Sequence, residues 1–318
     1  MKTVMVTGAS GFVGAALCRE LVQAGYSVVG VVRKVVEKIP LVTYLETDLV
    51  DTGAFIDHFP LVECVIHLAG RAHVLDERAE EPLTAFREAN RDATIRLARR
   101  ALNAGVKRFV FISSIGVNGN STQGRPFTES SPPKPHADYA VSKLEAEREL
   151  HALLKGESME LVIVRPPLIY AANAPGNFSR LLTLVSNGMP LPLASVHNAR
   201  SLVSLQNVLS FLKLCIEHPA AAGELFLVAD GQDVSTPEMV RSMAEGMGKR
   251  FSVVPFPVSF LRLGLAALGK SSLYEQLCGS LQVDAAKARR LLGWSPEEST
   301  RSGLEKAGRD FRFLRKNR

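Results

Sequence analysis

The chain has 318 residues, of which 46% are hydrophobic and 22% are charged, a composition typical of a globular protein with a substantial core. Its formal net charge of +6 at pH 7 is moderate, and no basic run is interleaved with aromatic residues, so nucleic acid is not an expected partner. The four cysteines are widely spaced, which predicts reduced thiols and excludes a disulfide scaffold. The seven histidines show no ligand spacing, so no metal is expected.

The ends of the chain and its most apolar stretch indicate where in the cell the protein is expected and whether it contacts a membrane. The first residues enter a strand pattern at once and lack the features of a secretory leader, which predicts a soluble, cytoplasmic protein. The stretch Val253–Gly269 is interrupted by prolines and by Arg262 and is shorter than the ~20 residues that span a bilayer. We therefore favour packing within a small domain over contact with a membrane. The basic C-terminal residues are expected to form a solvated tail, with weak peripheral association with an anionic membrane as the alternative.

Short β-branched runs alternate with helical stretches through the first half, which is the pattern of βαβ units in a parallel sheet. The strands are apolar throughout, as expected for a sheet that helices cover on both faces. The predicted strands are Thr3–Val6, Ser27–Val32, Val42–Leu45, Cys64–Leu68, Arg108–Ile112 and Leu161–Val164. Between them, helices are predicted over Phe86–Asn103 and Tyr139–Leu154.

A glycine-rich loop joins the first strand to a helical pattern. Gly8 permits a tight turn, Gly11 lets backbone N–H groups approach a pyrophosphate, and Gly14 lets the helix pack closely on the strand. The start of the helix then favours the phosphate charge. The loop therefore predicts a bound dinucleotide, with further contacts from the neighbouring residues Ser10, Phe12 and Val13.

The end of the second strand bears on the choice of nicotinamide cofactor. An NAD-selective protein normally offers Asp or Glu to the ribose hydroxyls there, but this chain has Arg33. Arg33 can bind a 2′-phosphate, stack on adenine or lie in solvent. We favour NADP(H) over NAD(H) on this basis.

Two pairs of polar residues indicate hydride chemistry. Tyr139 and Lys143 are four residues apart and share one face of a helix, and Ser113 and Ser114 end the fifth strand at the edge where ligands bind. Moving a hydride at carbon requires a proton to move at the attached oxygen. Tyrosine can carry it if its pKa falls from near 10 to near 7, which needs ~4 kcal/mol of stabilisation from Lys143 and the oxidised nicotinamide. Ser114 would hold the substrate oxygen, with Ser113 as the less favoured candidate.

After Arg165 the pattern changes to short segments separated by prolines. The predicted fold class is α/β, a Rossmann-type doubly wound parallel sheet with a smaller C-terminal α/β substrate domain. We place the NAD(P)-binding domain in residues 1–165, with about 200–230 returning to it, and the partly interleaved substrate domain in residues 166–318. The smaller domain should cover the carboxyl ends of the strands, where open α/β sheets bind ligands.

With the glycine loop, Ser114, Tyr139 and Lys143 in register, the chain resembles an extended short-chain dehydrogenase/reductase of the NAD-dependent epimerase/dehydratase family over nearly its whole length. The resemblance implies that Ser114 completes the catalytic triad and that Asn90 stabilises the fold near the active site. His67 lies at the end of the fourth predicted strand and is expected to be a packing residue and not a catalyst. The resemblance also implies cofactor contacts from Asp48, Leu49, Leu68, Ala69, Gly70, Asn90 and Pro166.

The second half resembles the family's binding site for a sugar nucleotide. Asn177 and Phe178 match the position where relatives hold the diphosphate by an asparagine and a backbone amide. Arg200 matches the arginine that clamps the same diphosphate, a task that suits a guanidinium fork. The segment departs from the family pattern at Ser204, which replaces histidine, and at Asn207, which replaces aspartate.

Local segments resemble a branch from bacterial surface-polysaccharide (O-antigen) pathways, with Asn118 in place of a usual tyrosine; they are Ser113–Gly119, Leu281–Asp284 and Leu292–Pro296. The leading prediction is a 4-ketoreductase of a UDP-linked N-acetylamino-6-deoxy-4-hexulose. The alternatives are a 4-epimerase of UDP-glucose or a UDP-N-acetylhexosamine that retains NAD, and a non-catalytic nucleotide-sensing protein. A 4,6-dehydratase is disfavoured, because Ile115 and Gly116 stand where dehydratases have an Asp-Glu pair. The sequence leaves open whether the protein forms a homodimer.

Overall fold

A computed structural model describes residues 1–51, 53, 58–71, 81–250, 253–269 and 271–316. Its main feature is a seven-stranded sheet in the order β3-β2-β1-β4-β5-β6-β9, with all pairings parallel. The strands of this sheet are β1 Thr3–Thr7, β2 Ser27–Val32, β3 Val42–Glu46, β4 Cys64–His67, β5 Arg108–Ile112, β6 Glu160–Arg165 and β9 Leu225–Leu227. The strand order reverses beside β1, so the doubly wound α/β fold class is confirmed.

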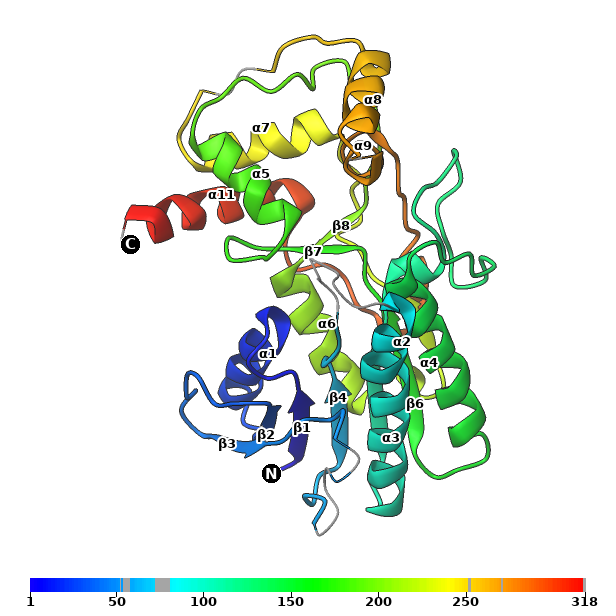
Figure 1. The fold of residues 1–318 in the computed structure, drawn as a ribbon. Coiled ribbons are helices and arrows are strands. Elements are labelled where there is room, and N and C mark those ends of the chain that lie inside the picture. The colour runs from blue at the N-terminus through cyan, green and yellow to red at the C-terminus, as the bar shows by residue number, and fades with distance from the viewer. Residues whose placement is uncertain (52, 54–57, 72–80, 251–252, 270, 317–318) are drawn as a thin grey trace.

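Helices cover both faces of this sheet (Figure 1). Leu17 of α1 and Phe211 of α6 belong to the core on one face, whereas Leu97 of α3 and Leu150 of α4 belong to the core on the other. The helices are α1 Phe12–Gln23, α2 Pro82–Arg87, α3 Ala93–Asn103, α4 Asp138–Leu154, α5 Asn177–Ser186, α6 Leu205–Glu217, α7 Thr236–Gly246, α8 Val258–Ala267, α9 Ser271–Cys278, α10 Ala286–Leu292 and α11 Thr300–Lys316. Short 3-10 turns lie at Ile115–Val117 and Pro219–Ala221.

The predicted helix over 86–103 begins earlier and is not uniform. It starts at Pro82 and contains a π-helical turn over Glu88–Asp92 between α2 and α3. Asn90 lies in this turn with its side chain fully buried. Such single π turns are frequent at functional sites, because the wider turn redirects a side chain.

The second half builds its own core around a two-stranded parallel sheet of β7 Leu168–Tyr170 and β8 Leu202–Ser204. Phe178 of α5 and Met243 of α7 are buried in this core. After β8 the chain returns to the large sheet, where α6 packs on one face and β9 pairs with β6. The boundary at residue 165 stays a prediction.

The stretch Val253–Gly269 packs only in part as expected, with Val253 and Val258 against the core of the second half. It forms α8, and none of the residues of this helix is buried. Its inner face rests against α9, but its outer face is also apolar and nothing in the described chain covers it. Within the described ranges, no helix is both long and apolar enough to cross a membrane.

Candidate active site

The glycine loop has the close contacts that its sequence predicts. Gly8 has a φ of +67°, a conformation that favours glycine, and Gly11 N donates a hydrogen bond to Gly8 O at 2.8 Å. A Cβ at Gly14 would lie 2.1 Å from Gly8 O, so only glycine lets α1 pack this closely. No side chain caps the N-terminus of α1 and no acidic residue lies in its first turn. The residues present therefore fit a dinucleotide pyrophosphate.

His67 is a structural residue at the end of β4. Burial and the nearby Lys143 charge lower its pKa to about 3, so the ring is neutral. Thr94 Oγ1 donates its proton to Asn90 O, so His67 Nε2 donates to Thr94 Oγ1 at 2.8 Å. His67 Nδ1 then accepts from Thr7 Oγ1 at 2.7 Å. This chain of hydrogen bonds ties the glycine loop to α3 below the site.

Asn90 and Gly70 bring the segment after β4 close to Lys143 of α4. Asn90 Oδ1 accepts from Arg71 N at 2.7 Å, and Asn90 Nδ2 donates to Ser142 Oγ at 3.0 Å. A Cβ at Gly70 would lie 2.9 Å from Asn90 Oδ1 and 3.5 Å from Lys143 Nζ. Asn90 thus fastens the segment after β4 to α4, and a side chain at Gly70 would crowd the Asn90 amide.

Lys143 is held at the carboxyl end of β5. Its Nζ donates to Ile112 O at 2.9 Å and lies 4.5 Å from the centre of the Phe111 ring. Burial lowers the pKa of Lys143 to about 8, against a smaller opposing effect from Glu147. The ammonium is therefore fixed in place and titrates near neutrality.

Tyr139 and Ser114 lie where α4 begins beside the end of β5. Burial raises the pKa of Tyr139 to about 12, so its phenol rests in the protonated form. Ser114 Oγ accepts from Gly116 N at 3.1 Å, and a Cβ at Gly116 would lie 3.4 Å from both Ser114 Oγ and Ala140 Cβ. Ser113 is buried, and its hydroxyl has no hydrogen-bond partner in the described part of the chain. Pro166 O accepts from Ile115 N at 3.0 Å and so supports the turn after Ser114.

The structure adds an acidic residue to the region around Arg33. Arg33 is exposed, and its guanidinium has no partner among the described residues. Glu46 is paired in register with Val32, and its carboxylate accepts from Val35 N at 3.0 Å. Although β2 itself ends without an acidic residue, Glu46 of β3 therefore places a negative charge close to Arg33. The sequence could not show that β3 ends beside this position.

Asp48 and Leu49 are engaged in local bonds. Asp48 Oδ1 accepts from Val50 N at 3.0 Å, and Leu49 O accepts from Arg96 at 3.3 Å. These hydrogen bonds explain the two residues as parts of a turn. Their predicted contact with adenine stays a prediction.

The candidate diphosphate residues come from two separate segments, the start of α5 and the segment before β8. Asn177 begins α5 and donates through Nδ2 to Gln276 of α9. Phe178 is buried 5.7 Å from the ring of Tyr170, so only its backbone amide can face a ligand. Arg200 donates to Gly279 O at 2.9 Å, and burial lowers its pKa. The start of α5 has no side-chain cap, as an anion site requires.

The two departures from the family pattern have structural roles. Ser204 Oγ caps α6 by accepting from Asn207 N at 3.1 Å. Asn207 Nδ2 donates to Asp230 Oδ1 at 2.7 Å and to Glu298 O at 2.9 Å. Both residues therefore fasten α6 to the second half.

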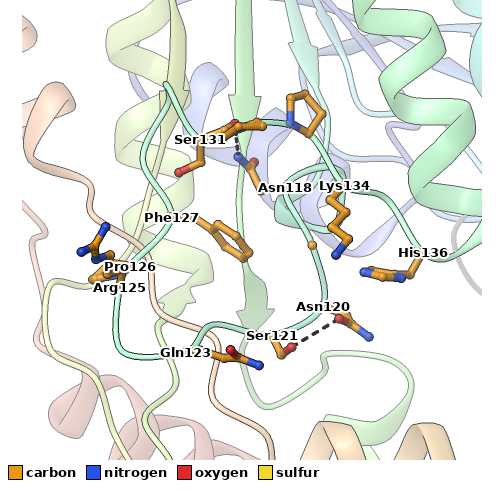
Figure 2. A pocket seen from close by; sticks show the side chains of 13 residues that line it. Asn118, Asn120, Ser121, Gln123, Arg125, Pro126, Phe127, Ser131, Lys134 and His136 are labelled. Carbon is orange, nitrogen blue, oxygen red and sulfur yellow. Dashed lines mark hydrogen bonds between the residues drawn. The ribbon is translucent and has the colours of Figure 1, made fainter.

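The segment between Ser114 and Tyr139 lines an open pocket of about 580 Å³ (Figure 2). Figure 2 shows Phe127 among the side chains that line it, with Lys134 and His136 along one side. Asn118 lines the pocket, donates to Ser131 O at 3.3 Å and accepts from Arg165 at 3.0 Å. Asparagine thus replaces the usual tyrosine while it bonds a buried arginine.

Comparisons with known proteins identify the family of this chain. The model of the NAD dependent epimerase/dehydratase family matches residues 4–229. A Vibrio cholerae relative named UDP-glucose 4-epimerase is 42% identical over 98% of this chain and 95% of its own length. The structure of UDP-glucose 4-epimerase from Thermotoga maritima with UDP-glucose has a TM-score of 0.78 at 21% identity, over 99% of this chain and 100% of that one.

A second solved structure carries the nicotinamide cofactor. UDP-glucuronic acid 4-epimerase from Bacillus cereus, in complex with NAD, has a TM-score of 0.76 at 20% identity, over 98% of this chain and 99% of that one. At this identity the solved structures show the fold, whereas the family model and the Vibrio relative match most of the sequence. The chain is therefore an enzyme of the NAD-dependent epimerase/dehydratase family, the extended short-chain dehydrogenases/reductases that act on sugar nucleotides.

Proposed function

We propose that this enzyme is an NADPH-dependent 4-ketoreductase of a UDP-linked N-acetylamino-6-deoxy-4-hexulose. The observation that carries the choice is at the end of β2, where Arg33 is exposed and unpaired within the described chain. Glu46 lies beside this position, but its carboxylate is bonded to Val35 N. A free guanidinium can therefore meet a 2′-phosphate there.

The bound cofactor supplies the hydride, and the chain's own residues handle the proton. Tyr139 rests protonated, which is the form that reduction of a ketone consumes. Burial raises the pKa of Tyr139 to about 12 instead of lowering it toward 7 as the sequence analysis expected, so the phenolate must be stabilised as the proton leaves. The fixed ammonium of Lys143 stabilises the phenolate, and the Ser114 hydroxyl holds the substrate oxygen.

A 4-epimerase is the second candidate. The near-full-length Vibrio cholerae relative carries the name UDP-glucose 4-epimerase. The same residues could serve this reaction, because epimerisation moves the proton and the hydride off C4 and back again. It needs oxidised NAD to stay bound through both halves, because release at the 4-keto stage ends the cycle.

The Arg33→Asp variant separates the two candidates. It removes an attraction for the 2′-phosphate and adds a repulsion, each on the order of 1 kcal/mol, so a preference for NADPH should turn into a preference for NADH. Titration of both reduced cofactors by nicotinamide fluorescence measures this. Lys34→Asp makes the same charge change at the next residue and should leave the order of affinities unchanged. A wild type that prefers NADH, or that purifies with NAD that dialysis cannot remove, rejects the ketoreductase and favours the epimerase.

Arg200→Ala should raise the KM for the sugar nucleotide by roughly ten- to a hundredfold, since a charge-assisted bond to the diphosphate contributes ~1.5–3 kcal/mol. Affinity for NADPH should hardly change. Calorimetry with UDP provides the direct measurement. Arg200→Lys keeps the charge and loses the guanidinium fork, so it should fall between the two. Equal UDP binding by Arg200→Ala and wild type would show that the diphosphate lies elsewhere.

The pH dependence of kcat/KM should report the loss of the positive charge on Lys143. Reduction requires protonated Tyr139 and charged Lys143, and their pKa values are about 12 and about 8. The kcat/KM for reduction at saturating NADPH should therefore fall as the pH rises through about 8, because Lys143 loses its charge while Tyr139 keeps its proton. Lys143→Arg should lower the rate and move this limb above pH 10, because arginine stays charged. A limb near pH 8 that survives in Lys143→Arg would belong to another group.

A further inference from the structure

The outer face of α8 is an apolar surface that no described part of the chain covers. It consists of Phe260 and Leu263 of the helix, together with Phe256 just before it and Leu268 just after it, and we call it the α8 surface. Phe260 is 61% exposed and Leu263 is 68% exposed. The rings of Phe256 and Phe260 lie 6.3 Å apart and so form one aromatic patch. A surface helix of a globular protein normally carries polar residues at these positions.

The inner face of the same helix accounts for its fold. Val258, Leu261 and Leu265 recur at helical spacing and are half-buried, and Val258 packs against the second core. The outer residues Phe260 and Leu263 are mostly exposed, so they contribute less to the packing of α8 than the inner residues do. An α-helix of this length, about 15 Å at 1.5 Å per residue, cannot cross the ~30 Å of a bilayer, so an apolar outer face suits a helix that lies along a surface.

The charges around α8 select the kind of surface. From Lys249 to Tyr274 the sequence contains four basic residues and no Asp or Glu; the basic residues are Lys249, Arg250, Arg262 and Lys270. Arg262 lies within α8 and is exposed. This stretch, which ends just before Glu275 of α9, interleaves apolar side chains with cations, a pattern that complements anionic lipid headgroups above an acyl layer.

We propose that α8 is an interfacial helix that docks this protein on an anionic lipid bilayer, with Phe256, Phe260 and Leu263 entering the headgroup region. The helix leads directly into α9, whose Gln276 bonds Asn177, while Arg200 bonds Gly279 just beyond it. Docking at α8 therefore holds the substrate-binding half, rather than the sheet, at the membrane. Figure 1 shows α8 at the end of the molecule away from the N-terminal edge of the sheet.

Vesicle co-sedimentation tests this docking. Wild type should sediment with vesicles of phosphatidylcholine and phosphatidylglycerol, much less with phosphatidylcholine alone, and less as salt is raised. Phe260→Ser and Leu263→Ser should each weaken binding by about tenfold or more. Leu61→Ser removes a side chain that is 88% exposed in the loop before β4, so it should bind as wild type does. Arg262→Glu should reduce binding to the anionic vesicles at low salt.

Two results would overturn the proposal. Wild type that stays in the supernatant with anionic vesicles rules out docking, and equal sedimentation with neutral vesicles rules out an anionic surface. Sedimentation velocity without lipid tests whether a second copy of the chain occupies this face instead. A dimer that Phe260→Ser converts to a monomer would assign the α8 surface to a second copy of the chain. The substituted side chains are exposed, and an unchanged thermal midpoint confirms that each variant is folded.

Discussion

Tyr139→Phe is expected to lower the single-turnover rate of reduction by at least about 100-fold, the contribution typical of a general acid. The change removes only the phenolic oxygen, which has no hydrogen-bond partner among the described residues. The ring contact with Phe86 at 6.3 Å remains. Fold and NADPH affinity should therefore stay close to wild type.

Rapid-quench measurement with enzyme in excess over substrate isolates this step from product release. Tyr26→Phe is the matched control, because its hydroxyl bonds Glu217 at 3.0 Å on the sheet domain, away from the site. It should turn over at the wild-type rate. If Tyr139→Phe kept more than a tenth of wild-type activity, another group would be the proton donor.

Arg165→Met should lower the free energy of unfolding by ~3–5 kcal/mol, because it leaves the buried carboxylate of Glu147 without its partner. The two side chains are 5% and 4% exposed. Arg165 Nε donates to Glu147 Oε1 at 2.9 Å, a second bond joins the same two groups, and Asn118 accepts a third. The loss should also loosen the segment between Ser114 and Tyr139, since Asn118 belongs to it.

Urea unfolding followed by circular dichroism measures this effect. Arg301→Met breaks an exposed pair with Glu305 and should change stability little. The double variant Arg165→Met/Glu147→Leu should recover much of the loss, because no unpaired charge then remains buried. A cost for Arg165→Met as small as that for Arg301→Met would contradict the role given to this pair.

Much of the fold and the general position of the site follow from local sequence rules. The glycine loop is specified by contacts within seven residues, because a Cβ at Gly14 would meet Gly8 O of the same loop. Tyr139 and Lys143 share a helix face because of their four-residue spacing. The apolar strand runs predicted six strands of the large sheet within a few residues of their ends. The predicted roles of these residues await the measurements above.

Only the tertiary structure decided the remaining features. The place of Glu46 beside Arg33 depends on the register of β3 on β2, and the bond between Asn118 and Arg165 joins residues 47 positions apart. The return of β9 to the large sheet and the uncovered face of α8 likewise depend on which surfaces meet. Periodicity shows that a residue is apolar and on which face it lies. It does not show whether a partner covers that face, because burial is set by segments far away in the chain.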